Sequence, residues 1–324
     1  MNARSRMLGM IALTLAALSA GAQAQGYPNR PIRLIVPFTT GGGNDTLARL
    51  FGQKLTEAWG QTVVVENRPG AGGTIGTALV ATAPPDGYTL LISSIATHAV
   101  SPQLYKDPGY DPLKNFTPIA LLGVAPVVMG VNQSVPAKTV AEFIALAKAK
   151  PGALKYGSGG NGSVMHTAGM VFSQAAGISM LHVPYKGAGP AYIALGGTEV
   201  DVVIDTTAAL LPLIRSGRVR GLAVARKSRL TDFPELPTFA EAGLPGYEAN
   251  GWYSMHAPAG TSPEIVARLN QEINRILALP DVQERYRLLS TDGTPGTPAQ
   301  LDAFVKSERA KYVKVIKDAG MVAE

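Results

Sequence analysis

The sequence has 324 residues, and 46% of them are hydrophobic, which is enough to build a sizeable core. Its formal net charge is +6, but Lys and Arg are scattered without dense basic tracts or interleaved aromatic residues, which argues against a nucleic-acid partner. Cysteine is absent, so the chain has neither a disulfide framework nor a lipid-attachment cysteine.

The first 24 residues have the pattern of a secretory signal peptide. Arg4 and Arg6 precede an apolar run at 7–18, and the sequence A-Q-A at 22–24 suits cleavage before Gln25. The apolar run is too short for a membrane anchor, because spanning a bilayer takes about 20 residues. Cleavage would leave 300 residues with a net charge of +4. We expect the mature chain to be exported.

The beginning of the mature chain alternates strand-like and helix-like segments. Short β-branched or aliphatic runs bounded by Gly, Pro or Asn predict strands at 31–38, 62–67 and 88–93. Helical spacing of apolar residues predicts helices at 45–59 and 73–83. Strands separated by helices pair in parallel through right-handed crossovers, so this part predicts an open α/β sheet.

The alternation continues after a change of loops and ends in a helical tail. A strand is predicted at 126–132 and an amphipathic helix at 139–150. Further strands, with helices between them, are predicted at 154–158, 180–185, 200–205 and 219–225, followed by an extended strand at 251–260. The remaining pattern predicts three helices, at 262–278, 281–289 and 298–319.

A tail without its own sheet most economically covers the first domain. We therefore expect domain 1 to comprise 25–124 plus 257–324 and domain 2 to comprise 125–256, with two crossovers near 123–128 and 252–258. The carboxyl ends of both sheets would face a shared cleft, where ligands of open α/β sheets bind. The fold class is α/β, with the layout of a two-lobed periplasmic binding protein of type II that closes on its ligand.

The segment "VPFTTGGGNDTLARL" at 36–50 runs from a strand through three glycines into a helix. A helix N-terminus carries unpaired N–H donors and partial positive charge, so it can bind an anion without Lys or Arg. No basic residue occurs between Val36 and Ala48. The alternative is a plain turn in which Asn44 or Asp45 caps the helix. The candidate contacts here are Phe38, Thr39, Thr40, Gly41, Gly42, Gly43, Asn44 and Asp45.

Two further loops of the first domain reach the same predicted rim. Gly72 lies in a glycine-rich segment that opens a helix, where either ligand contact or tight helix–strand packing explains the glycines. Ser93 and Ser94 end the third strand, where their hydroxyls face the cleft or cap the next segment.

In the second domain, "YGSGGNGSVMH" places Ser158, Asn161, Gly162 and Ser163 before a helix that begins near Val164, which is a second helix start suited to an anion. His166 follows Ser163 at i,i+3 spacing and either binds a carboxylate or is packed as a structural histidine.

The segment "PYKGAGPA" adds Tyr185, Lys186 and Gly187 as candidates, although a solvated side chain is the commoner fate of a lysine. Asp205 ends a strand and either accepts a hydrogen bond from an ammonium, hydroxyl or protonated carboxyl group of the ligand or caps the next helix. Trp252 and Tyr253 are expected to support the hinge.

Searches for catalytic and metal motifs give no match. The four histidines are widely separated and form no metal-binding pattern, and the chain has neither a G-x-S-x-G elbow nor a phosphate loop. "GAGGTIG" does not fit G-x-G-x-x-G. We therefore expect no metal, no cofactor and no enzymatic activity. A Ser/His/Asp set assembled from distant positions stays open, because spacing cannot exclude it.

Six ordered motifs across the mature chain resemble the periplasmic receptors of tripartite tricarboxylate transporters, also called Bug-type solute-binding proteins. The motifs are "VPFTTGGGNDTLAR", "VVVENRPGAGGTIGT", "APPDGYTLLIS", "YGSGGNGSVMHTAG", "VPYKGAGPAYIALGGTEVDVVID" and "LPTFAEAGLPGYEANGWYSMHAPAGT". The resemblance implies a monomeric receptor whose two facing loops grip a carboxylate with backbone amides, hydroxyls and waters. It also implies location in the periplasm of a Gram-negative bacterium and delivery to a permease with one large and one small membrane subunit.

Two roles fit this resemblance. The first is transport of a di- or tricarboxylate or an aromatic carboxylate, and the second is a periplasmic sensor that signals through a partner receptor. The sequence does not separate them. With its companion motifs, the 36–50 segment is interpreted as part of the ligand site.

Overall fold

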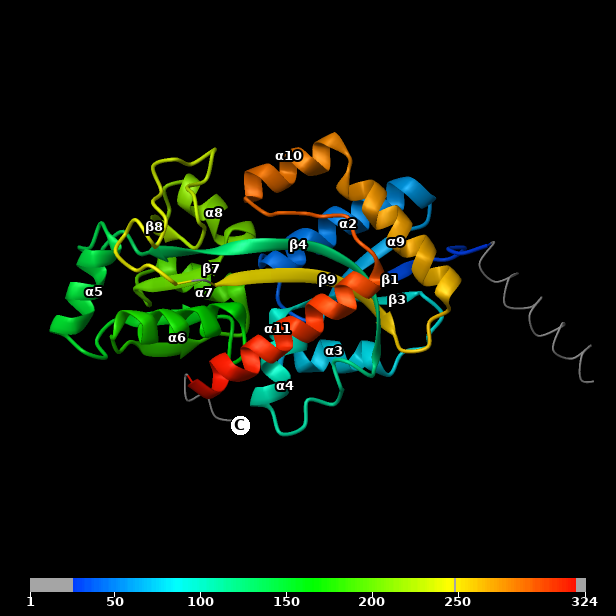
Figure 1. The fold of residues 1–324 in the computed structure, drawn as a ribbon, viewed down its shortest axis with the longest axis horizontal. Coiled ribbons are helices and arrows are strands. Elements are labelled where there is room, and N and C mark those ends of the chain that lie inside the picture. The colour runs from blue at the N-terminus through cyan, green and yellow to red at the C-terminus, as the bar shows by residue number, and fades with distance from the viewer. Residues whose placement is uncertain (1–25, 248, 319–324) are drawn as a thin grey trace, which may run out of the picture.

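Residues 26–247 and 249–318 are described in the computed structural model of the protein, and the predicted signal peptide at 1–24 lies outside them. Two lobes lie side by side along the long axis of the molecule (Figure 1). Two long strands, β4 (Phe116–Val131) and β9 (Asn250–Pro258), run between the lobes. The predicted α/β fold with two lobes and two crossovers is confirmed.

The first lobe contains the predicted parallel strands. β1 (Ile32–Val36) pairs in parallel with β2 (Val63–Asn67) and with β3 (Thr89–Ser94). Two helices follow β1 and β2, namely α2 (Gly43–Trp59) and α3 (Thr74–Ala81). In α2 the apolar residues at i, i+4 and i+8 are all fully buried, which is the periodicity expected of a helix that covers a sheet.

A short helical segment after β3 was not predicted. It consists of one π-helical turn, η2 (Ala96–Val100), followed by α4 (Ser101–Leu104). A 3-10 turn, η1 (Ala71–Gly73), precedes α3. η2 follows the carboxyl end of β3, and η1 precedes the start of α3. Both turns place residues toward the space between the lobes.

The second lobe has its own sheet. β5 pairs in parallel with β6 and with β7, while β8 pairs antiparallel with β4. The elements are α5 (Val140–Ala149), β5 (Lys155–Ser158), α6 (Val164–Ala176), β6 (Leu181–Pro184), α7 (Ala188–Gly196), β7 (Val202–Thr206), α8 (Thr207–Arg215) and β8 (Arg220–Val224). All four predicted strands of this region are present.

One strand joins the two sheets. The first part of β4 pairs antiparallel with β9, and its last five residues pair with β7. β9 also pairs with β3. The sequence predicted only 126–132 of β4, so its first ten residues are an addition to the expected fold. Because β4 and β9 are hydrogen-bonded to each other, the two crossovers form one ribbon.

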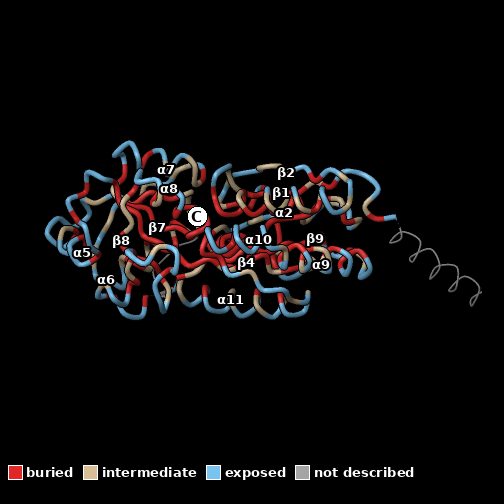
Figure 2. The backbone as a smooth tube through the Cα atoms, turned by 90° about the horizontal axis from the view of Figure 1, so that it is seen from above, coloured by how far each residue is buried: buried red, intermediate tan, exposed pale blue. Residues whose placement is uncertain are grey.

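The tail helices are α9 (Pro263–Leu277), α10 (Pro280–Leu289) and α11 (Pro298–Asp318). α9 contributes buried apolar residues to the core of the first lobe, as expected. α10 additionally reaches the second lobe, since Thr207 Oγ1 donates to the carbonyl of Ser290 at 3.1 Å. α11 lies on the opposite side of the ribbon from α2 and α7 (Figure 2). No helix in the described part of the chain is both long and apolar enough to cross a bilayer.

Candidate functional site

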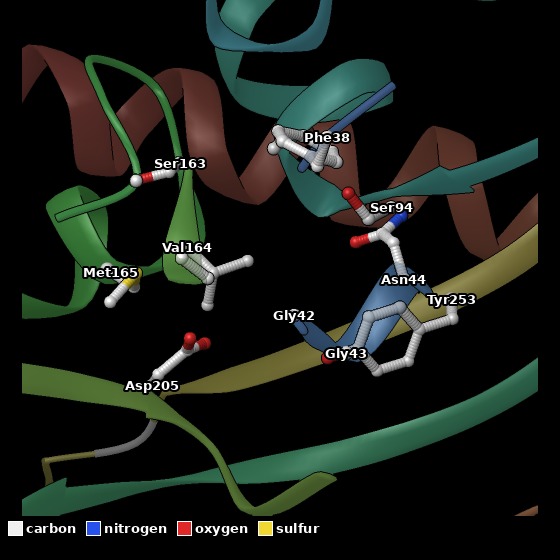
Figure 3. A pocket seen from close by; sticks show the side chains of 13 residues that line it. Phe38, Gly42, Gly43, Asn44, Ser94, Ser163, Val164, Met165, Asp205 and Tyr253 are labelled. Atoms are coloured by element: carbon white, nitrogen blue, oxygen red, sulfur yellow. The ribbon is translucent and has the colours of Figure 1, made fainter. Parts of the chain in front are cut away.

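A cavity lies where the carboxyl ends of β1, β3, β5 and β7 meet, between the two lobes. It offers about 40 Å³ of room to water-sized molecules, within about 420 Å³ of space that is not filled by protein atoms and is partly open solvent. Figure 3 shows side chains from both lobes converging on it. Its lining residues are Phe38, Gly42, Gly43, Asn44, Ser94, Ala96, Gly159, Ser163, Val164, Met165, Ala188, Asp205 and Tyr253. We call it the inner cavity.

The N-terminus of α2 opens onto the inner cavity without a side-chain cap. Gly42 is the N-cap residue, with an extended backbone (φ −85°, ψ 172°), and no side chain accepts a hydrogen bond from the first turn. Gly42, Gly43 and Asn44 line the cavity. The first amides of a helix have no partner within the helix, so those of α2 offer donors and partial positive charge to whatever occupies the cavity.

Asp45 does not cap this helix but braces the loop before it. Its Oδ2 accepts from the amide of Gly41 at 3.1 Å and from Arg49 Nε at 3.0 Å. Its Oδ1 accepts from Asn67 Nδ2 at 3.0 Å. Despite the cost of burial, these hydrogen bonds hold the pKa of Asp45 below its ordinary value. Asp45 is therefore ionised and committed to the shape of the loop, and the amide of Gly41 is used within the protein.

The two serines at the end of β3 point to opposite faces, as successive residues of a strand do. Ser93 Oγ lies 2.9 Å from His256 Nδ1 and 2.7 Å from Ser254 Oγ, so it belongs to a buried polar network. Ser94 lines the inner cavity, is 0% exposed, and its hydroxyl has no hydrogen-bond partner among the described residues. A buried hydroxyl without a partner calls for a ligand or water at that point.

On the facing side, the loop between β5 and α6 uses several of its polar groups internally. Ser163 Oγ accepts from the amide of His166 at 3.2 Å and caps α6. The amide of Gly162 donates to His166 Nδ1 at 3.1 Å, and the amide of Gly160 donates to Ser158 Oγ at 3.1 Å. The first amides of α6 itself, at Val164 and Met165, adjoin the cavity lining.

His166 serves this loop as a neutral ring. It stacks on His182 with ring centroids 4.3 Å apart, and Ser158 Oγ lies 2.6 Å from His182 Nε2. Burial lowers the pKa of both histidines to about 4, so near neutral pH neither carries a charge. A cationic histidine therefore does not contribute to the site at neutral pH.

Asp205 is the acidic residue of the inner cavity. Its Oδ2 accepts from the Tyr192 hydroxyl at 2.5 Å, and its Oδ1 accepts from the amide of Thr206 at 2.7 Å. Burial raises its pKa to about 6. None of the described residues that line this cavity is Lys, Arg or His, so within its lining the helix N-termini are the source of positive potential.

Tyr253 also lines the cavity, although the sequence assigned it to the hinge. Its hydroxyl lies 2.7 Å from Thr206 Oγ1, so it joins β9 to the second lobe while its ring borders the cavity. The sequence signal was the alternation of a strand, which turns neighbouring residues to opposite faces. The structure buries Trp252 under α11, so Tyr253 faces the cleft side.

A second, outer chamber adjoins the inner cavity and shares Phe38 and Gly159 with it. It offers about 400 Å³ of room to water-sized molecules. Thr39 lines it, and the hydroxyl of Thr39 is buried without a partner among the described residues. Besides Phe38, six predicted site residues lie here: Thr39, Gly72, Asn161, Tyr185, Lys186 and Gly187. Lys186 places an ammonium group at this chamber.

The lobes touch around the cavity. A Cβ atom added at Gly42 would lie 3.3 Å from the Cβ of Ala188, and one added at Gly187 would lie 1.9 Å from Thr39 Oγ1. These close approaches join the loop before α2 to the start of α7, which belongs to the other lobe. The structure is therefore a closed arrangement of the two lobes.

The predicted site residues fall into three groups. Seven line the inner cavity: Phe38, Gly42, Gly43, Asn44, Ser94, Ser163 and Asp205. Six line the outer chamber, as given above. Seven line neither of these two cavities: Thr40, Gly41, Asp45, Ser93, Ser158, Gly162 and His166. The sequence did not identify Ala96, Gly159, Val164, Met165, Ala188 and Tyr253 as lining residues.

Comparisons with known proteins point to one family. Residues 47–321 match the family described as "Tripartite tricarboxylate transporter family receptor". Protein BugT of Bordetella pertussis is 37% identical over 98% of this chain and 98% of its own length. The structure of Rpa4515 of R. palustris with adipate is 37% identical, with a TM-score of 0.89 over 92% of this chain and 100% of that one.

The structure of MatC (Rpa3494) from Rhodopseudomonas palustris with bound malate is 34% identical, with a TM-score of 0.85 over 90% of this chain and 100% of that one. The predicted resemblance to Bug-type receptors is thus confirmed, as is the expectation of a solute-binding receptor instead of an enzyme. The chain belongs to the receptors of the tripartite tricarboxylate transporter family.

Proposed function

We propose that this protein captures a carboxylated small molecule, a di- or tricarboxylate or an aromatic carboxylate, in the inner cavity. One carboxylate would accept hydrogen bonds from the first amides of α2, with the Ser94 hydroxyl and the first amides of α6 beside it. The observation that carries the proposal is the uncapped N-terminus of α2 in a cavity whose described lining includes no Lys, Arg or His. Such a site recognises an anion through main-chain donors.

The unpaired hydroxyl of Ser94 supports the same position, because a carboxylate oxygen there would satisfy it. Two relatives have carboxylates in their structures, adipate in one and malate in the other. The seven predicted residues that line the inner cavity are proposed as its ligand contacts, with Ala96, Gly159, Val164, Met165, Ala188 and Tyr253 completing its wall.

The proposal extends to transport. Residues 1–24 would direct the chain to the periplasm and be removed there. The mature receptor would act as a monomer of two domains, 25–124 plus 257–324 and 125–256, which close on the acid. The acid shifts the equilibrium between the open and the closed form only if it binds the closed form more tightly. The closed form would then deliver the acid to a membrane permease of the tripartite tricarboxylate type, as the family description indicates.

A thermal-shift series on ligand-stripped mature protein tests carboxylate capture. We expect at least one acid among C4–C6 dicarboxylates, citrate, phthalate and nicotinate to raise the melting temperature, by an amount that grows with the logarithm of the ratio of its concentration to its Kd. The methyl ester or amide of the best acid should lose most of that shift, because a neutral group does not draw on the helix N-terminus. An ester that stabilises as well as the acid would contradict the proposal.

A further inference from the structure

Asp205 presents a carboxylate to the inner cavity from a fixed position. It lies near the end of β7, opposite Val128 of β4 in the sheet, and only 6% of its surface is exposed. Figure 3 shows its oxygens pointing into the cavity from the side opposite Ser94 and Asn44. The Tyr192 hydroxyl and the Thr206 amide each donate to one oxygen.

The hydrogen bonds from Tyr192 and Thr206 leave Asp205 with unused acceptor capacity and an unpaired charge. An ionised carboxylate has about four lone-pair sites, and its donors in the described structure are the Tyr192 hydroxyl and the amide and hydroxyl of Thr206. No ion pair to Asp205 occurs among the described residues, and its two partners are neutral groups. A buried carboxylate is costly unless further donors or a cation satisfy it.

Asn44 adds a second acceptor on the same cavity. Its Nδ2 donates to the carbonyl of Ile92 at 3.4 Å, which turns its Oδ1 toward the cavity (Figure 3). The cavity therefore has a donor side, formed by the start of α2 and Ser94, and acceptors at Asp205 and Asn44. An acid with nothing but carboxylates and methylenes matches the donor side alone, and above pH 6 or so, where Asp205 is ionised, it brings a like charge to this residue.

We infer that the ligand is a carboxylic acid that also carries a hydrogen-bond donor, an ammonium or a hydroxyl group, which binds Asp205. This inference rests on the proposed capture of a carboxylate and specifies the second recognition element of that ligand. An ammonium group would pair with the Asp205 charge at low effective dielectric, whereas a hydroxyl group would supply one hydrogen bond.

Matched acids of equal length test the inference by isothermal titration calorimetry. Succinate, malate and aspartate form one set, and glutarate, 2-hydroxyglutarate and glutamate form the other. In the set that fits the cavity, we expect a donor-bearing acid to bind at least about tenfold more tightly than the unsubstituted acid, because leaving buried polar groups unpaired is costly. Whether the amino or the hydroxy acid binds more tightly identifies the donor.

Asp205→Asn separates charge recognition from folding. The variant keeps Oδ1 as an acceptor for the Thr206 amide, and its Nδ2 can donate to the Tyr192 oxygen, so we expect it to fold. The variant should bind the donor-bearing acid at least about tenfold more weakly than the wild type does. It should bind the unsubstituted acid with the same affinity as the wild type, or with a higher one. If its melting temperature shows that it does not fold, Asp205→Ser replaces it in the same titrations.

Asp201→Asn is the matched control. Asp201 stands just before β7 and accepts from the amide of Lys155 at 2.7 Å, and it does not line the inner cavity. This variant should bind every acid as the wild type does. Equal binding of substituted and unsubstituted acids by the wild type, or an equal loss for both in Asp205→Asn, would overturn the inference while leaving carboxylate capture intact. Failure of every acid to bind would instead overturn the proposed function and this inference together.

Discussion

Replacing Gly42 with Val is expected to abolish carboxylate binding while leaving both lobes folded. The backbone of Gly42 is extended, so a β-branched residue can adopt it without strain. A Cβ atom there would lie 3.3 Å from the Cβ of Ala188, and the two methyl groups of valine would need further space in the same contact. Because Ala188 begins α7 of the other lobe, the clash arises only when the lobes close.

Calorimetry with the best acid of the thermal-shift series measures this effect. We expect the affinity to fall by about a hundredfold or more, which corresponds to about 2.7 kcal/mol. The control is Gly196→Val, at an exposed position of α7 where an added Cβ meets nothing within 4 Å. If Gly42→Val binds the acid with wild-type affinity, binding does not require this contact. If Gly42→Val loses the circular dichroism spectrum of the folded protein, the residue serves stability.

Replacing Trp252 with Ala is expected to cause the largest loss of stability. Its side chain is 1% exposed and packs edge to face against Phe304 of α11, with ring centroids 5.6 Å apart. It lies opposite Val124 in the ribbon of β4 and β9. Truncation of a large buried aromatic residue costs about 3–5 kcal/mol, through lost burial and the cavity left behind. Urea unfolding followed by far-ultraviolet circular dichroism measures it.

Trp252→Phe is the conservative variant for this site. It keeps an aromatic ring against Phe304, and the indole Nε1 that it removes has no hydrogen-bond partner among the described residues. Its cost should therefore be clearly smaller than that of the alanine variant. A loss below about 1 kcal/mol in Trp252→Ala would mean that α11 is held to the ribbon by other contacts.

Local patterns were sufficient to predict most elements of the fold. The apolar spacing in α2 and the short β-branched runs of β1, β2 and β7 each favour one structure, and the structure agrees. The first half of β4 was missed because Pro118 and Gly123 resemble loop residues. The pairing with β9 accommodates them through register shifts next to each, and such long-range pairing overrides local propensity.

The site was predicted less completely, because its details depend on contacts between distant residues. Loop sequences identified the start of α2 and the loop before α6 as parts of the rim. They could not show that His166 would accept from Gly162, or that Ser158 would meet His182, which is 24 positions away. Apolar contacts such as Met165 and Ala188 carry no chemical signal in a sequence, so only the fold reveals them as cavity walls.

A crystal structure of the mature protein with its best-binding acid is the most direct test of the central claim. We expect one carboxylate of the acid within hydrogen-bond distance of the first amides of α2, with Ser94 Oγ as a further donor and the start of α6 on the facing side. A carboxylate held chiefly by arginine or lysine side chains, or one placed away from residues 42–45 and 163–165, would contradict it.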